Sequence, residues 1–184
     1  MLDLIAPDVS VSFEYDVFPE LLRRGLDFYS FAPESNQDVY WIDLGTPERY
    51  IQAHHDLLAG RVRCATKIES TSTDSPKNEN GERAAIESDD APIIANSLIG
   101  SNCMIKPGAH ITDSVLGEGC VIEEGARVSG TVLWAHTRIG ANAQVTDAII
   151  GRGCHVGRDC RVVAGTVLGD KTSLTDYTRT GAIL

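Results

Sequence analysis

The stretch IGANAQVTDAIIGRGCHV, residues 139–156, decides the fold, because its large aliphatic residues return after six, five and six positions. The same spacing, 6-6-5 repeated and finally 6-6-6, connects a series of thirteen aliphatic residues. They are Ile99, Ile105, Ile111, Leu116, Ile122, Val128, Leu133, Ile139, Val145, Ile150, Val156, Val162 and Leu168. A pattern that closes on itself after every three such steps is typical of a solenoid, in which each turn buries its apolar edge against neighbouring turns.

Two further positions of the repeat favour a parallel β-helix with three short faces per coil. A small side chain follows four positions after many of the aliphatic residues, which suits a narrow triangular interior: Cys103, Ala109, Cys120, Ala126, Thr137, Ala143, Cys154 and Cys160. A glycine directly follows six of the thirteen aliphatic residues, and we expect these glycines to form corners with positive φ. They are Gly100, Gly117, Gly140, Gly151, Gly157 and Gly169. An amphipathic helix is excluded, because its apolar stripe would return about every 3.6 residues. The sequence therefore predicts a mainly β chain with a hexapeptide-repeat left-handed parallel β-helix.

The composition limits the classes of partner. The chain has 26 acidic and 16 Lys or Arg residues, a net charge of −10, which argues against binding to nucleic acid or to an anionic membrane. Its first residues lack the pattern of a secretory signal, and no stretch has the roughly 18 apolar residues of a membrane helix. Four of the five cysteines fall at the small inward position, which disfavours a disulfide framework or a zinc site. We therefore expect a cytoplasmic protein.

Composition also divides the chain into four segments. Residues 1–62 mix helix and strand signals, residues 63–92 are polar, residues 93–174 carry the repeat, and residues 175–184 form a tail. The polar segment has too few large apolar side chains to offset the entropy cost of ordering. We expect it to be a linker between the first segment and the solenoid.

A candidate ligand-binding carboxylate, Asp43, lies upstream of the repeat. The apolar run Val39-Tyr-Trp-Ile42 predicts a buried strand that ends just before it. Thr46 as N-cap and Pro47 at the first helical position predict the start of a helix, and Gly60 predicts its end. The carboxyl ends of strands in open α/β sheets face the ligand crevice, so Asp43 would face a substrate or a hard cation. The alternative is a turn aspartate that accepts hydrogen bonds from backbone N–H groups.

Two sequence motifs upstream of the solenoid resemble those of a known family. They are SFEYDVFPELL, residues 12–22, and YWIDLGTPERY, residues 40–50. With a hexapeptide solenoid after them, they resemble the C-terminal portion of sugar-1-phosphate nucleotidyltransferases, most closely the mannose-1-phosphate guanylyltransferase branch. The resemblance implies that residues 1–62 are the C-terminal fragment of an α/β, Rossmann-like nucleotidyltransferase domain.

The resemblance also implies roles for two side chains. These enzymes join a sugar 1-phosphate to a nucleoside triphosphate and release pyrophosphate, mainly through positioning and charge neutralisation. In the family, the aspartate of the W-x-D-x-G-T-P motif helps to hold Mg²⁺, and the matching residue here is Asp43. Glu14 would approach the sugar site or else stabilise a helix start. No catalytic residue is assigned, and GTP is the nucleotide that the resemblance favours.

The chain departs from the family at the nucleotide site, because these 184 residues contain no G-x-G-T-R-x-x-P signature to cradle a triphosphate. We therefore expect the chain to be inactive by itself and to associate with copies of itself or with a catalytic homologue. Two other functions stay open. One is a non-catalytic regulatory or assembly subunit of such an enzyme. The other is a hexapeptide acyltransferase using His110, His136 or His155 as base, although each falls at an outward position where an exposed polar residue is expected.

Overall fold

The computed structural model of this chain describes residues 5–32, 39–62 and 91–181. These residues belong to two compact units, residues 1–39 and residues 40–184, and each unit is described by itself. The segment predicted to be a linker, residues 63–92, lies outside the described residues except for its last two positions.

The first unit is built around a short helical segment. Its N-cap is Ser12, whose hydroxyl accepts a hydrogen bond from the backbone N–H of Tyr15. The π-helical turn η2 (Phe13–Val17) leads directly into α1 (Phe18–Arg23). Residues 5–32 contain no strand, so the α/β character predicted for this part of the chain is not confirmed.

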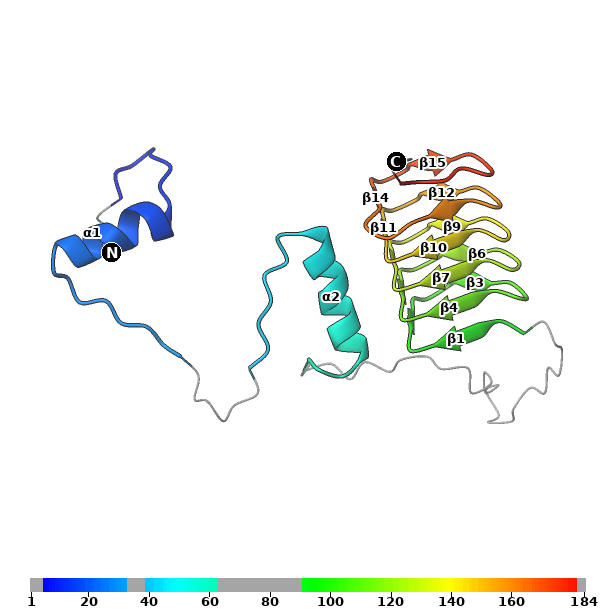
Figure 1. Ribbon diagram of the computed structural model, residues 1–184, viewed down its shortest axis with the longest axis horizontal. Helices are drawn as coiled ribbons and strands as arrows, with labels where there is room; N and C mark the ends of the chain where they lie inside the picture. Colours follow the sequence, from blue (N-terminus) through cyan, green and yellow to red (C-terminus); the bar gives the residue numbers. More distant parts are fainter. Residues whose placement is uncertain (1–4, 33–38, 63–90, 182–184) are drawn as a thin grey trace. The chain divides into compact units, whose positions relative to one another are not determined.

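The second unit contains a solenoid made of three parallel sheets (Figure 1). The first sheet consists of β1 (Ile93–Ala95), β4 (His110–Thr112), β7 (Arg127–Ser129), β10 (Gln144–Thr146) and β13 (Arg161–Val162). The second consists of β2 (Leu98–Ile99), β5 (Val115–Leu116), β8 (Val132–Leu133), β11 (Ile149–Ile150) and β14 (Val167–Leu168). The third consists of β3 (Met104–Ile105), β6 (Val121–Ile122), β9 (Arg138–Ile139), β12 (His155–Val156) and β15 (Ser173–Leu174). Each coil thus contributes one short strand to each sheet.

The strand register reproduces the predicted period. Ile111 pairs with Ile94 in the coil before it and with Val128 in the coil after it, so the same spacing applies in both directions. In the last coil the spacing is longer by one position, since Ile149 pairs with Val167. Equivalent residues of successive coils therefore stack into continuous ladders, which confirms the parallel β-helix.

The interior contains the predicted aliphatic ladders. Ten of the thirteen aliphatic residues are buried, and the three partly buried ones, Ile99, Ile105 and Leu168, lie toward the ends of the stack. Burying one such side chain contributes about 1.5–3 kcal/mol. The ladders are therefore the main source of stability in this unit.

The small inward residues also satisfy polar groups of the backbone. The thiol of Cys120 donates to the carbonyl of Trp134 at 3.3 Å, and the hydroxyl of Thr137 in the next coil donates to the carbonyl of Gly151 at 2.8 Å. Cysteine and threonine can both occupy this inward position because both are small donors. Burial raises the pKa of the Cys120 thiol to about 11, so the thiol keeps its proton.

The prediction that the corner glycines have positive φ is wrong. On the six-residue faces positive φ occurs at the third residue after the aliphatic one, as at Asn142 (φ 58°) and Gly153 (φ 64°). On the five-residue face it occurs at the second, as at Asp147 (φ 44°), and Gly140 is not among the residues with positive φ. A Cβ at Gly140 would lie 2.6 Å from the backbone nitrogen of Arg158 in the next coil. Close approach of stacked backbones, rather than φ, therefore requires glycine at this corner.

A third inward column was not predicted. It contains Ser97, Ser114, Thr131 and Ala148, all of which are buried. The hydroxyl of Ser97 accepts from the N–H of Ser114 at 3.1 Å, and that of Ser114 accepts from the N–H of Thr131 at 3.1 Å. The pattern was missed because, on the five-residue face, the small residue follows the aliphatic one after three positions instead of four.

Between residues 39 and 62 the structure contains one helix, α2 (Pro47–Leu58), and no strand at Val39–Ile42, so the predicted strand is wrong. A strand is completed by hydrogen bonds to a neighbouring strand, and residues 39–62 place none beside this stretch. Trp41 is instead 82% exposed. None of the described helices is long and apolar enough to span a bilayer.

The described part of the predicted tail continues the solenoid. The backbone N–H of Tyr177 donates to the carbonyl of Arg158, and that of Thr180 donates to the carbonyl of Arg161, each at 2.9 Å. Arg179 pairs with Arg161 in an isolated parallel bridge. Residues 175–181 therefore stack on the preceding coil.

Candidate functional site

Helix α2 begins and ends where the sequence predicts. The hydroxyl of the N-cap Thr46 accepts from the backbone N–H of Arg49 at 3.3 Å, and Pro47 is the first helical residue. Gly60 has a φ of +70° and follows the last turn, where its N–H donates to the carbonyl of Leu57 at 3.0 Å. These contacts confirm the predicted helix.

Asp56 connects α2 to the residues before it. Its carboxylate accepts from the hydroxyl of Tyr40 and the amide of Gln52, each at 2.7 Å, and from Nε of Arg61 at 2.8 Å. The Tyr40 hydroxyl and the Arg61 guanidinium hold the pKa of Asp56 below its ordinary value, because both stabilise the ionised form. The carboxylate therefore stays ionised and fixes Tyr40 to the last turns of the helix.

Helix α2 lies along one corner of the solenoid. The residues of its first turn line a cavity together with Val167 of the last coils. Residues at and beyond its end line a second cavity together with Asn96 and Asp113 of the first coils. The 12 residues of α2 span about 18 Å, and successive coils are about 4.8 Å apart. The helix is thus long enough to contact about four coils.

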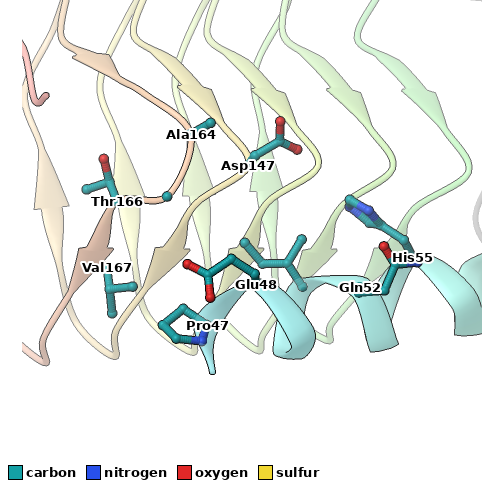
Figure 2. A pocket seen from close by; sticks show the side chains of 10 residues that line it. Pro47, Glu48, Gln52, His55, Asp147, Ala164, Thr166 and Val167 are labelled. Carbon is teal, nitrogen blue, oxygen red and sulfur yellow. The ribbon is translucent and has the colours of Figure 1, made fainter. Parts of the chain in front are cut away.

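The first cavity has a volume of about 300 Å³ and a mainly apolar lining (Figure 2). The helix contributes Pro47, Glu48, Ile51, Gln52 and His55, and the solenoid contributes Asp147, Ala164, Gly165, Thr166 and Val167. In Figure 2 the helix runs across the coils below the turn that carries Asp147. We call the two cavities together the α2 groove, since both are lined by His55 and Asp147.

The second cavity, of about 310 Å³, is mainly polar. In it, Nε2 of His55 is buried and has no hydrogen-bond partner. A Cβ at Gly130 would lie 2.0 Å from Oδ1 of Asp147 and 3.4 Å from this nitrogen, so both groups face the space above Gly130. An unsatisfied buried nitrogen beside a carboxylate suits a hydrogen-bonding ligand group or a water. The residues lining the groove provide no hydrogen-bonded pair of nucleophile and base.

Asp43 lies just before α2 and lines neither cavity. Its carboxylate accepts from the N–H of Gly45 at 3.1 Å and pairs with Arg49 at 3.2 Å. This is the geometry of the turn-aspartate alternative, yet the side chain is 56% exposed and accessible to a ligand. Across residues 5–32, 39–62 and 91–181, no three His, Cys, Asp or Glu side chains converge on one metal position. The role of Asp43 as a metal ligand stays a prediction.

Glu14 lies in the first unit, in the first turn of η2, and its side chain is exposed. A carboxylate there stabilises the positive end of a helix dipole, which is the helix-start alternative. The structure does not place Glu14 relative to Asp43, because the two belong to separate units. Its contact with a sugar stays a prediction.

The three histidines of the acyltransferase hypothesis lie on different parts of the solenoid. His110 belongs to the first sheet, and its Nδ1 lies 2.9 Å from the carbonyl oxygen of Gly108. His155 belongs to the third sheet, and His136 occupies a corner with a φ of 61°. None of the three lines either cavity beside α2, and the acyltransferase alternative stays a prediction.

An ionic cluster around the buried carboxylate of Glu123 escaped the sequence analysis. The carboxylate of Glu123 contacts Lys106 at 2.5 Å and Arg138 at 2.6 Å. Lys106 and then Arg138 lower the pKa of Glu123, so this carboxylate stays charged although it is buried. Lys106 and Glu123 are one coil apart in the sequence, so the coil period itself was the signal that could have paired them.

Two comparisons relate the chain to known proteins. Residues 80–179 match the family model described as the EIF2B subunit epsilon LbH domain. Over 116 residues, 60% of this chain, the sequence is 28% identical to the mannose-1-phosphate guanylyltransferase of Mycobacterium tuberculosis (strain ATCC 25618 / H37Rv). The chain spans 29% of the length of this curated relative. The matches confirm the β-helix and the resemblance to nucleotidyltransferases.

Proposed function

Because the chain belongs to the family of the EIF2B subunit epsilon LbH domain, we propose that it forms the solenoid-bearing part of a sugar nucleotidyltransferase. One observation carries the proposal. The likeness to the guanylyltransferase covers 60% of the chain, whereas the residues from Ile93 onward make up only half of it. The likeness therefore includes residues upstream of Ile93, and the two family motifs lie further upstream in the same chain. The name of the relative supports mannose 1-phosphate and GTP as substrates and GDP-mannose as product.

In this proposal, an oxygen of the sugar phosphate attacks the α-phosphorus of GTP and pyrophosphate leaves. Bound Mg²⁺ would neutralise charge on the phosphates. This ion is commonly held by one or two carboxylates together with substrate phosphates and waters, so the single exposed carboxylate of Asp43 fits the task. Arg49, which pairs with Asp43 in the structure, would keep that carboxylate oriented until the ion binds. Glu14 would contact the sugar.

We assign the solenoid to assembly and to communication with the nucleotidyltransferase segment. The solenoid contacts that segment through α2, which begins at the end of the Trp41-Ile-Asp-Leu-Gly-Thr-Pro47 motif and lies along the solenoid corner. Asp56 extends the connection to Tyr40, which closely precedes the assigned metal ligand in the sequence. A displacement of α2 would therefore move Asp43 directly.

The test is an assay of GDP-mannose formation from GTP, mannose 1-phosphate and Mg²⁺. We expect turnover by the native protein that carries this chain, and none by the 184 residues alone, which lack the triphosphate-cradling signature. A panel with ATP or dTTP and with glucose 1-phosphate measures the choice of substrates. Failure of the native protein to form a nucleotide sugar from every pair contradicts the proposal.

A second candidate is a non-catalytic assembly or regulatory subunit. It is favoured by the description of the matching family, which names a subunit and covers residues 80–179, the solenoid and the residues just before it. In this case the chain would purify with a catalytic homologue, and removing the chain would change the oligomeric state or regulation of that homologue. The mass of the native assembly, measured by light scattering, separates a homo-oligomer from such a mixed complex.

A further inference from the structure

A third cavity lies on the outer face of the solenoid and shares no lining residue with the α2 groove. Its volume is about 390 Å³, within the usual range for small-molecule sites. The lining residues are Asn142, Gln144, Asp159, Cys160, Arg161, Tyr177 and Arg179. They come from the last three coils, at the edge of the first sheet where β10 and β13 lie.

The strand register aligns three arginines on this face. Arg127, Gln144 and Arg161 are register partners in successive coils, and Arg179 follows as the bridge partner of Arg161. All three arginines are exposed. Neighbouring strands are about 4.8 Å apart, so Arg161 and Arg179 place two positive charges side by side. Like charges directly opposite each other on strands are destabilising unless an anion compensates them.

Three cationic side chains of the solenoid have carboxylate partners, whereas Arg127, Arg152 and Lys171 have none among residues 91–181. Lys106 and Arg138 share the carboxylate of Glu123, and Arg158 pairs with Asp176 at 3.0 Å. Within residues 91–181, by contrast, the guanidinium groups of Arg161 and Arg179 form no ion pair, although the carboxylate of Asp159 lines the same cavity. The cavity therefore has two uncompensated cations at its wall.

We propose that Arg161 and Arg179 bind the phosphate group of a small phosphorylated molecule in this cavity. A phosphate monoester carries close to two negative charges at neutral pH, which matches the two guanidinium groups. The planar guanidinium fork suits bidentate contact with phosphate oxygens. The amides of Asn142 and Gln144 would hydrogen-bond the rest of the ligand. The site is independent of the proposed nucleotidyltransferase reaction.

The surroundings favour a small ligand over an extended polyanion. The chain carries a net charge of −10, which repels nucleic acid and anionic membranes at long range. The carboxylate of Asp159 at the cavity also restricts how much negative charge can be accommodated. The guanidinium of Arg158 lies 5.3 Å from the ring centre of Tyr177 and occupies one side of that ring. These features favour one compact anionic group at the two arginines.

The test is titration of the chain with inorganic phosphate, and then with pyrophosphate, at constant ionic strength, followed by the backbone amide signals in NMR. We expect saturable shifts centred on residues 142–144, 161 and 177–180. Arg161→Gln and Arg179→Gln should each weaken binding roughly tenfold, the loss of one charge-assisted contact. Arg152→Gln is the matched control, since Arg152 is also an exposed arginine but lies outside the cavity, and it should leave the affinity unchanged.

Parallel titrations with acetate and with sulfate identify the kind of anion that the site prefers. Phosphate should bind more tightly than acetate, because a carboxylate carries only one negative charge. Absence of saturable shifts with phosphate, or equal weakening by Arg152→Gln and Arg161→Gln, would overturn the proposal. Unchanged amide spectra of the free variants would show that they are folded, because the substituted side chains are exposed.

Discussion

The solenoid and the α2 segment, residues 40–62, belong to one unit but are stabilised in different ways. In the solenoid, each inward residue contacts its equivalents in the coils before and after it, so ten buried aliphatic side chains form a few continuous ladders. The α2 segment depends on single polar groups, chiefly the cap of Thr46 and the carboxylate of Asp56. Substitutions in the solenoid should therefore have effects graded by their place in the stack. In the α2 segment the effects should depend on which residue is replaced.

The largest effect should come from the middle of a ladder. Ile139→Ala removes a fully buried side chain and should lower the free energy of unfolding by about 4 kcal/mol, because the surrounding coils cannot close the cavity. Leu168→Ala, in the last coils and only partly buried, should cost roughly half as much. Urea unfolding followed by circular dichroism measures both. Equal losses would show that position in the stack does not matter.

The next largest effect should come from the close approach of coils. Gly140→Ala places a Cβ 2.6 Å from the backbone nitrogen of Arg158 and should cost about 2–3 kcal/mol through displacement of the next coil. The matched control is Gly169→Ala, since a Cβ there meets no atom within 4 Å. Thermal unfolding compares the two variants. If both lose the same stability, stacking contact is not the reason for glycine at this corner.

In the α2 segment, Asp56→Asn should cost about 2 kcal/mol at pH 7, because it removes a charged acceptor shared by three side chains. The pKa of Asp56 is lowered in the folded protein, first by Tyr40 and then by Arg61. Its stabilisation is therefore fully present above the unfolded pKa, about 3.9, and is lost as the pH falls through the lower folded value. Unfolding curves of both proteins from pH 7 downward should converge in acid. A difference that does not change with pH would contradict an ionised Asp56.

The smallest effects should come from the corners with positive φ. Gly153 (φ 64°) and Lys171 (φ 59°) occupy equivalent corners of successive coils. Gly153→Ala should cost about 1 kcal/mol, because a Cβ disfavours the left-handed conformation. Lys171→Gly should change stability by less than about 1 kcal/mol, since the relief of strain is partly offset by greater freedom of the unfolded chain. Differential scanning calorimetry measures both, and a large loss in Lys171→Gly would show that its side chain matters more than its φ.

The sequence predicted the solenoid because the spacing of the aliphatic residues from Ile99 to Leu168 equals the coil period. It did not predict why Gly140 is glycine, since the backbone that excludes a Cβ belongs to Arg158, a full coil further along the chain. The strand prediction at Val39–Ile42 failed because apolar residues form a strand only beside another strand. The helix from Pro47 was predicted correctly because its cap and first residue are local signals.

The sites were less predictable than the fold. The α2 groove depends on how a helix lies along the coils, which no local pattern encodes. The arginine column could have been found by aligning residues one coil apart, since Arg127 and Arg161 are separated by two periods and Arg179 follows after one more coil. The column was missed because the total charge of the solenoid says nothing about which charged residues lie one coil apart.

The measurement that tests the account most directly is the rate of GDP-mannose formation by the native protein with Asp43→Asn. Loss of a carboxylate that holds the metal should lower kcat at limiting Mg²⁺ by at least roughly a hundredfold. Glu124→Gln is the control, because Glu124 is an exposed carboxylate of the solenoid that lines none of the three cavities, and it should retain the wild-type rate. A rate unchanged by Asp43→Asn would contradict the account and leave Asp43 as a turn residue that accepts from Gly45.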